Sequence, residues 1–242
     1  MPTPTKKKRL SLNKVLALLL LYSVQGIPFG FFLFTFPLHL RGQGMGLGKI
    51  TFLSIVNLPW LVKFLWAPLV DKYWFPRLGR RKSWIWPAQG FLIVALVVTG
   101  LLVSRLSLVG FLVALTVINL FASTQDIAVD GLAVDILEEW ERGMGNAIQA
   151  AAFKIGMLGG GFGLTFVLSY YSIATCFYLM AAAVFVVSLA PFLVREPPPI
   201  GEEAAASGRQ VILGLLTTWF RRPGTLVFLA FLLFAKAGDA LA

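Results

Sequence analysis

Six apolar runs dominate this sequence, and each is long enough to cross a lipid bilayer. A helix rises about 1.5 Å per residue, so about 20 apolar residues cross the roughly 30 Å hydrocarbon core. We therefore expect an all-α membrane protein, with residues 1–195 forming a bundle of six transmembrane helices. The runs cover residues 15–40, 50–70, 84–103, 108–137, 143–170 and 172–194.

Composition excludes most other protein classes. Of the 242 residues, 58% are hydrophobic and 13% are charged, whereas a soluble domain carries about 25% charged residues. The only cysteine and the only histidine, Cys176 and His39, exclude an intramolecular disulfide and leave no Cys/His cluster for a metal. No nucleophile with an adjacent base stands out. We expect no catalytic residues, no metal and no cofactor.

Positive charge orients the chain in the membrane. The net charge is +10, and 15 of the 21 Lys and Arg residues lie before residue 15, at 72–82, at 142 and at 195–222. These places are alternate loops, and cytoplasmic loops carry such an excess of positive charge. We therefore expect a multi-pass protein with a cytoplasmic N-terminus, and no nucleic-acid partner.

Residues 196–224 differ from the runs before them. Three prolines at 197–199 stand among glutamates, as expected of a cytoplasmic linker, and apolar residues at helical spacing over 211–220 indicate a short amphipathic helix. A seventh apolar run covers residues 225–242. This order is expected of a two-repeat transporter cut just after its midpoint, in the seventh helix.

The loop after the second run combines an acid, several bases and a glycine. Asp71 and Lys72 end the run, and Gly79, Arg80 and Arg81 precede the third. An Asp at a helix end beside cations can form a charge-assisted latch that holds one of two moving halves closed. The alternative is an anchor that only sets orientation. The loop resembles the signature loop of the major facilitator superfamily, with four extra residues before the glycine.

Three further motifs narrow this resemblance to the AmpG-type muropeptide permeases and their acetyl-coenzyme A transporter relatives. They are QGIPFG at 25–30, LPWLVKFLWAP at 58–68 and TQDIAVDG at 124–131. The resemblance implies proton-driven import of a polar solute, such as an anhydromuropeptide, across the bacterial inner membrane. Lys236 and Asp239 resemble the opening of that family's second half, which is an expected partner together with the solute, protons and the bilayer.

Charged residues within the apolar runs are candidate coupling groups. An ionisable group inside a membrane helix costs about 2.5–3.5 kcal/mol, so it needs a partner or a water-filled cavity. Asp126 and Asp130 are four residues apart and share a helix face, where two carboxylates can share a proton. The alternative is that Asp126 with Lys63, or Asp130 with Lys154, forms a purely structural pair.

Two amides complete the candidate site. Gln125 precedes Asp126, and Gln25 precedes Pro28. Pro28 and Pro37 either break the first helix, which would free carbonyls toward a solute beside Gln25, or merely kink it. Asp135 lies on the opposite side of its helix from Asp126 and is expected to pair with the basic loop. Glycines at 156–163 predict close packing of the fifth helix against a neighbour.

Two other functions remain open. A major-facilitator transporter of another solute, such as a sugar, a cofactor-like molecule or a drug, fits the same residues because specificity would depend on both halves. A membrane scaffold without transport would use the charges only for packing.

Overall fold

In a computed structural model of the protein, residues 10–46, 48, 50, 54–197 and 224 are described. The chain divides into two compact units, residues 1–199 and 200–242, and nearly all described residues belong to the first. The expected amphipathic linker helix and seventh run, with Lys236 and Asp239, lie outside the described residues.

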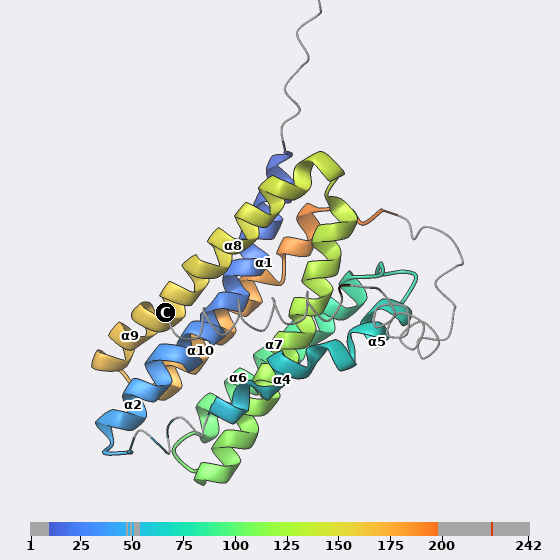
Figure 1. The fold of residues 1–242 in the computed structure, drawn as a ribbon. Coiled ribbons are helices and arrows are strands. Elements are labelled where there is room, and N and C mark those ends of the chain that lie inside the picture. The colour runs from blue at the N-terminus through green and yellow to red at the C-terminus, as the bar shows by residue number, and fades with distance from the viewer. Residues whose placement is uncertain (1–9, 47, 49, 51–53, 198–223, 225–242) are drawn as a thin grey trace, which may run out of the picture. The chain divides into compact units, whose positions relative to one another are not determined.

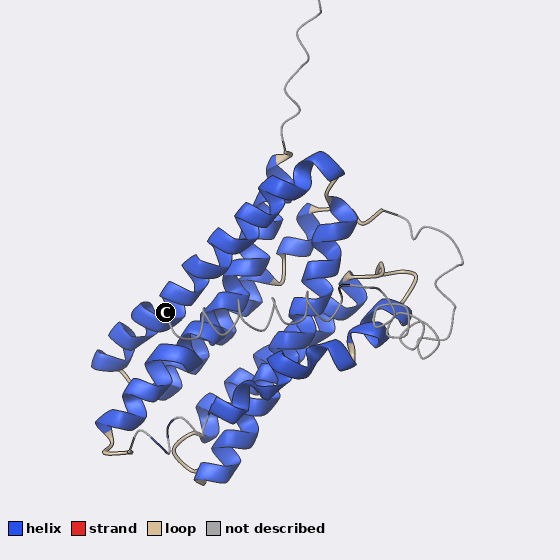
Figure 2. Cartoon of the chain, viewed as in Figure 1, coloured by secondary structure: helices blue, strands red, loops and turns tan. Residues whose placement is uncertain are grey.

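The described part of the first unit consists of helices joined by turns and short loops (Figures 1 and 2). Among the described residues, five helical runs are long and apolar enough to cross a membrane, and each agrees with an expected run to within about four residues at either end. This confirms the predicted all-α, multi-pass membrane fold. The five are Leu12–Gly42, Lys82–Leu102, Leu108–Ile136, Glu139–Tyr170 and Ile173–Leu193.

The first of these runs is composite. Helix α1 (Leu12–Gly30) continues through a π-helical turn, η1 (Phe31–Thr35), into α2 (Phe36–Gly42). Pro28 lies inside α1 and Pro37 lies in the first turn of α2, and the helical run passes through both prolines without a break. Each proline lacks the N–H of a regular helical hydrogen bond, and the wider π-helical turn lies between them.

The other long runs are also built from α-helices, some joined by short 3₁₀ or π-helical turns. A second π-helical turn, η5, lies within the fourth long run. The elements are α6 (Lys82–Leu102), α7 (Leu108–Ile136), η4 (Glu139–Glu141), α8 (Arg142–Leu158), η5 (Gly159–Gly163), α9 (Leu164–Tyr170), α10 (Ile173–Val187) and η6 (Ala190–Leu193).

The run expected as one helix over residues 50–70 is broken. Its described part is four short segments: η2 (Ser54–Asn57), α4 (Leu58–Val62), η3 (Lys63–Leu65) and α5 (Ala67–Lys72). A proline stands in the first turn of both α4 and α5. Proline is tolerated there and disfavoured in a helix interior, so each one favours a fresh helix start over an unbroken span.

Serine side chains begin three of the long helices. Ser11, Ser107 and Ser172 cap α1, α7 and α10, and each hydroxyl accepts a hydrogen bond from the backbone N–H three residues later, at 3.2–3.4 Å. Such caps satisfy an N–H that has no partner within the helix, and they set where each run starts.

Helices α1 and α8 lie side by side with their backbones in contact (Figure 1). A Cβ added to Gly156 would overlap the carbonyl oxygen of Ser23, and one added to Gly160 would overlap that of Ile27. A Cβ on Gly26 would in turn overlap the carbonyl oxygen of Phe153. The predicted close packing of the glycine-rich helix is therefore confirmed, and its partner is the first helix.

The two π-helical turns, η1 and η5, come directly after α1 and α8 along the chain and pack against each other. The Thr35 hydroxyl lies 2.8 Å from the carbonyl oxygen of Gly160 and 2.7 Å from that of Gly161, and 2.9 Å from the Thr165 hydroxyl. Wide turns release carbonyls from the helical ladder, and a buried Thr hydroxyl satisfies them across the interface.

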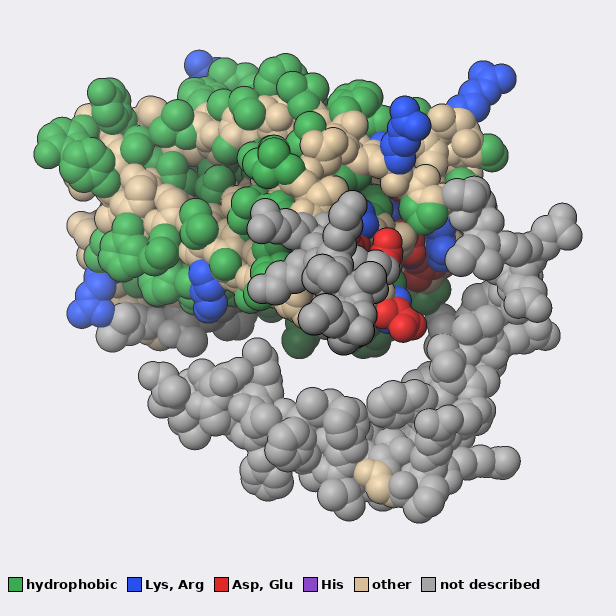
Figure 3. Space-filling model, turned by 90° about the horizontal axis from the view of Figure 1, so that it is seen from above, with side chains coloured by type: hydrophobic (Ala, Val, Ile, Leu, Met, Phe, Trp, Pro, Cys, Tyr) green, Lys and Arg blue, Asp and Glu red, His purple; other side chains and the backbone are tan. Residues whose placement is uncertain are grey.

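The outer surface suits a lipid environment. Large apolar side chains such as Phe91, Val94 and Leu101 of α6 are exposed, and Figure 3 shows hydrophobic side chains over much of the described surface on the face it presents. Exposing such side chains to the hydrocarbon core of a bilayer costs no free energy, whereas exposing an apolar surface of this size to water is unfavourable.

The glycine contact gives a direct test of the packing. Gly156→Ala and Gly160→Ala should each lower the free energy of unfolding by about 1–3 kcal/mol or more, because the new methyl group would overlap a backbone that cannot move aside. Thermal unfolding in nanodiscs measures this loss.

The same helix supplies matched controls. A Cβ added to Gly159 or Gly163 meets nothing within 4 Å, so the alanine variants at these positions should unfold at the wild-type temperature or above it. Equal destabilisation at all four glycines would contradict the contact.

Candidate functional site

An ion pair joins the broken second run to α7. Lys63 in η3 donates to the carboxylate of Asp126, which is buried, while Lys63 is half-buried. Two indole groups join the second run to α7 as well. The Trp60 N–H donates to Asn119 Oδ1 at 2.9 Å, and the Trp66 N–H donates to Thr124 Oγ1 at 3.2 Å. The Asp126–Lys63 pair, which the sequence left open as the structural alternative, is therefore present.

Asp130, one turn further along α7, has only neutral partners among the described residues. Its Oδ1 accepts hydrogen bonds from the Tyr22 hydroxyl of α1 at 2.8 Å and from Gln149 Nε2 of α8 at 3.2 Å. The alternative Asp130–Lys154 pair does not form: Lys154 is exposed and has no ion pair with a described carboxylate.

Two of the candidate amides are buried and have amide atoms without a hydrogen-bond partner among the described residues. Gln25 is 2% exposed with neither amide atom bonded, and Gln125 is 1% exposed with its Nε2 unbonded. A third, Gln89 of α6, is fully buried with both amide atoms unbonded, and the sequence patterns did not single it out. Buried polar groups normally have partners, so each of these amides needs an explanation.

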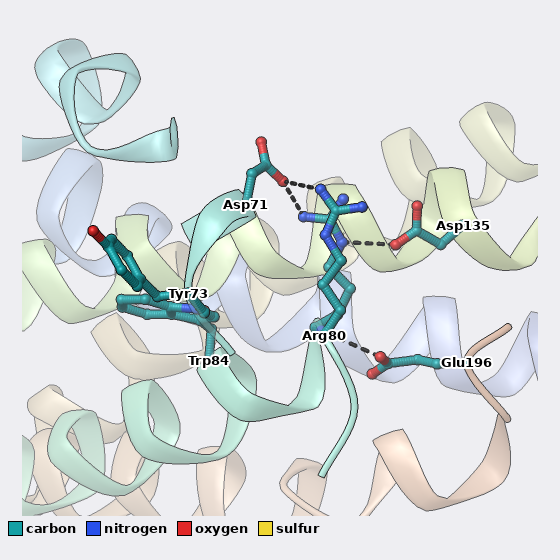
Figure 4. Close-up of polar contacts among 7 residues, drawn as sticks. Asp71, Tyr73, Arg80, Trp84, Asp135 and Glu196 are labelled. Carbon is teal, nitrogen blue, oxygen red and sulfur yellow. Dashed lines mark hydrogen bonds and ion pairs between the residues drawn. The ribbon is translucent and has the colours of Figure 1, made fainter. Parts of the chain in front are cut away.

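The basic loop gathers around Arg81, at the start of α6. Figure 4 shows Asp71, Asp135 and Glu196 around the arginine side chains of this loop. Its Nε donates to Asp135 Oδ2 at 2.7 Å and its Nη1 donates to Asp71 Oδ1 at 2.5 Å, while Arg80 Nη2 lies 3.4 Å from the same Asp71 oxygen. Burial acts to lower the pKa of Arg81, and the hydrogen bonds to Asp135 and Asp71 raise it above its usual value. The expected pairing of Asp135 with the basic loop is confirmed.

Glu196 holds the start of α6 from the other side. Its carboxylate accepts the backbone N–H groups of Arg81 and Lys82 at 3.0 and 2.8 Å, where a helix N-terminus favours negative charge. Gly79 has φ of 98°, a conformation that favours glycine, and a Cβ there would lie 2.7 Å from Glu196 Oε2. Both the backbone conformation and the closeness of Glu196 therefore favour a glycine at this position.

Lys72 makes fewer polar contacts than Arg80 and Arg81 among the described residues. Its ammonium lies 5.3 Å from the centroid of the Tyr73 ring, and it has no ion pair with a described carboxylate.

Several of these partners were not predicted from the sequence. Tyr22, Asn119 and Gln149 are neutral polar residues in apolar runs, and nothing in their spacing marks them. Glu196 was read only as part of the linker, although its position after the last run places it beside the basic loop.

Spanning helices with charged side chains held between them define a multi-pass membrane protein. The family model described as Acetyl-coenzyme A transporter 1 matches residues 14–174, and the chain belongs to this family. The family resemblance predicted from the motifs is therefore confirmed.

Curated relatives extend the match over most of the chain. The anhydromuropeptide permeases of Escherichia coli K12 and O157:H7 are each 32% identical over 230 residues, covering 93% of this chain and 46% of the relative. An uncharacterised protein of Haemophilus influenzae is 32% identical over 213 residues, covering 85% of this chain and 49% of the relative. The chain thus spans about half the length of these relatives, and the named ones are permeases, not enzymes.

Arg81 offers a test of the loop cluster. Arg81→Lys should lower the free energy of unfolding by about 1–3 kcal/mol, because one ammonium cannot bridge two carboxylates as the guanidinium fork does. The Arg81 side chain is 8% exposed, which keeps water from replacing the lost contact. Thermal unfolding in nanodiscs, compared with wild type, measures the change.

Arg80→Lys is the matched control. Its side chain is 30% exposed, lies 3.4 Å from Asp71, and has its guanidinium 5.9 Å from the centroid of the Trp74 ring, a contact that a lysine can keep. The substitution should therefore cost no more than about 0.5 kcal/mol. If the two variants were equally stable, Arg81 would not be the centre of the cluster.

Proposed function

We propose that this chain is the first half of a secondary transporter that imports an anhydromuropeptide-type solute together with protons across the bacterial inner membrane. Its N-terminus is cytoplasmic, and a second half, entered through Lys236 and Asp239, completes the solute path. The names of the permease relatives support the solute class, and the family name supports transport.

The charge balance of Lys63, Asp126 and Asp130, which we call the mid-span cluster, carries the proposal. Lys63 pairs with Asp126, and Asp130 lies one turn further along α7, so the three side chains bring one cation and two carboxylates. An uncompensated charge inside a membrane is costly, so adding one proton, which brings the group to neutrality, is favourable. A site that gains stability by taking up one proton has the property that proton coupling requires.

Asp130 is the carboxylate that we assign as the proton carrier. Asp126 is already held by Lys63, whereas Asp130 has the neutral donors Tyr22 and Gln149. Both donors lie on other helices, α1 and α8. Loss of the charge on Asp130 weakens both hydrogen bonds, and this links protonation to the positions of three helices.

Lys63 and Lys154 are the proposed contacts for anionic groups of the solute. A carboxylate that approaches Lys63 competes with Asp126 for the same ammonium, which couples solute binding to the ion pair. Lys154 is exposed near the middle of its run, where a cation facing hydrocarbon would be costly. Gln25 and Gln125, with amide atoms free, supply hydrogen bonds to the solute.

Arg81 with its carboxylates serves as the conformational latch in this proposal. Asp71 is half exposed on its side chain, so its second oxygen is free to accept from the facing half in one state and to release it in the other. Lys72, Gly79 and Arg80 shape the same loop.

Uptake into proteoliposomes tests the proposal. The complete transporter, meaning this chain with the proposed second half, receives labelled anhydromuropeptide with an acid exterior and a negative interior. Wild type should accumulate the solute, and a protonophore should abolish accumulation. Asp130→Asn should retain solute exchange and lose at least tenfold of the accumulation, since exchange needs no net proton movement.

Two further variants sharpen the result. Lys63→Gln with Asp126→Asn removes both charges of the pair and should leave folding intact while accumulation falls. Glu139→Gln, at an exposed acid in the loop before α8, is the control and should match wild type. Accumulation by Asp130→Asn at the wild-type level would remove Asp130 from coupling, and a folded wild type without uptake would refute the solute assignment.

A further inference from the structure

Three aromatic side chains form a row across three helical segments. Phe29 of α1 is central: its ring centroid lies 5.4 Å from that of Phe153 of α8 and 6.1 Å from that of Trp60 of α4. The Lys63 ammonium lies 5.7 Å from the centroid of the Trp60 ring. We call Phe153, Phe29 and Trp60 the aromatic row; all three are half-buried.

A charged pair lies at one end of the row. Lys63, above the Trp60 ring, is the same ammonium that pairs with Asp126, and a cation at this depth does not face hydrocarbon. The indole N–H of Trp60 is held by Asn119, so the orientation of that ring is defined. Phe29 and Phe153 lie close to the middle of their runs, the depth at which transporters bind their solutes.

The glycine contact makes the row rigid. Gly26 of α1 lies against the backbone at Phe153, and Gly156 of α8 lies against Ser23. Each glycine is three residues from a ring of the row, so backbone contact fixes the spacing of Phe29 and Phe153. Rigid, half-exposed aromatics bind ligands with little loss of side-chain entropy.

We infer that the aromatic row is a platform for a pyranose ring, so that the solute is recognised through its sugar. The inference rests on the proposed function, because it takes this face to border the solute path. The C–H groups on one face of a pyranose carry partial positive charge and fit the negative faces of aromatic rings.

Polar groups for the sugar stand next to the row. Lys63 and Asp126 offer a donor and an acceptor to hydroxyl groups at one end. Gln25 is four residues before Phe29 on the same face of α1, is 2% exposed, and has no partner for either amide atom. An amide can both donate to and accept from an acetamido group, which would supply the partners that Gln25 lacks.

The ring angles favour a pyranose over a flat nucleobase. Phe29 is inclined by 74° to Trp60 and by 55° to Phe153. A planar base can stack on only one ring of such a set, whereas the C–H groups of a puckered sugar point in several directions and can reach more than one ring.

Saturation-transfer difference NMR tests the platform directly. The probe is the methyl glycoside of N-acetylglucosamine, added to the whole chain in nanodiscs, with adenosine as the comparison. Sugar ring protons should receive saturation from wild type. Phe29→Leu should weaken binding about three- to tenfold, the value of one aromatic contact, whereas Phe29→Tyr, which keeps the ring, should bind as wild type does.

Phe166→Leu is the matched control. This ring pairs with Tyr170 in α9, away from the row, and is exposed, so its loss should leave the sugar signals unchanged. The platform is refuted if wild type gives no sugar signal at millimolar probe, if Phe29→Leu leaves the signal intact, or if adenosine alone depends on Phe29.

The outcome is separable from that of the proposed function, because binding needs neither a proton gradient nor the second half. Sugar binding that depends on Phe29 in a protein without uptake would keep the platform and refute the transport proposal. Proton-driven uptake together with sugar signals that do not change in Phe29→Leu would support the transport proposal and refute the platform.

Discussion

Helix α1 touches α8 and η5 backbone to backbone at Gly26, Gly156 and Gly160, and the polar interior is arranged around that contact. On one side it brings Tyr22 and Gln149 to the same oxygen of Asp130. In lipid there is little hydrophobic drive between helices, so van der Waals contact of this kind holds them together. The contact therefore sets the positions of the groups that meet at mid-span.

Two of the charged clusters differ in their balance of acids and bases. Around Arg81 one guanidinium faces Asp71 and Asp135 at the ends of three helices, at a depth where water and loop residues share the cost. At mid-span, Lys63 faces Asp126, and Asp130 depends on neutral donors. The first cluster is suited to holding helix ends together, whereas the second changes its net charge with a single proton.

The long runs were predictable because length and hydropathy alone determine a membrane span, and the glycine contact was predictable from the local density of small residues. The break of the second run was not, since its prolines were read as part of an apolar span, although each one starts a short helix. The partners of Asp130 were also hidden: Tyr22 and Gln149 come from distant helices, and only tertiary packing brings them together. The pairing of Asp135 with the basic loop was predictable from helical geometry, because Asp135 lies on the opposite side of α7 from Asp126.

A pH recording shows whether protons move with the solute. Solute is added to weakly buffered proteoliposomes of the complete transporter without any imposed gradient. We expect solute entry to make the medium more alkaline in wild type, whereas Asp130→Asn, which retains only exchange, should show neither net solute entry nor a pH change. Solute entry into wild type at constant external pH would contradict proton coupling.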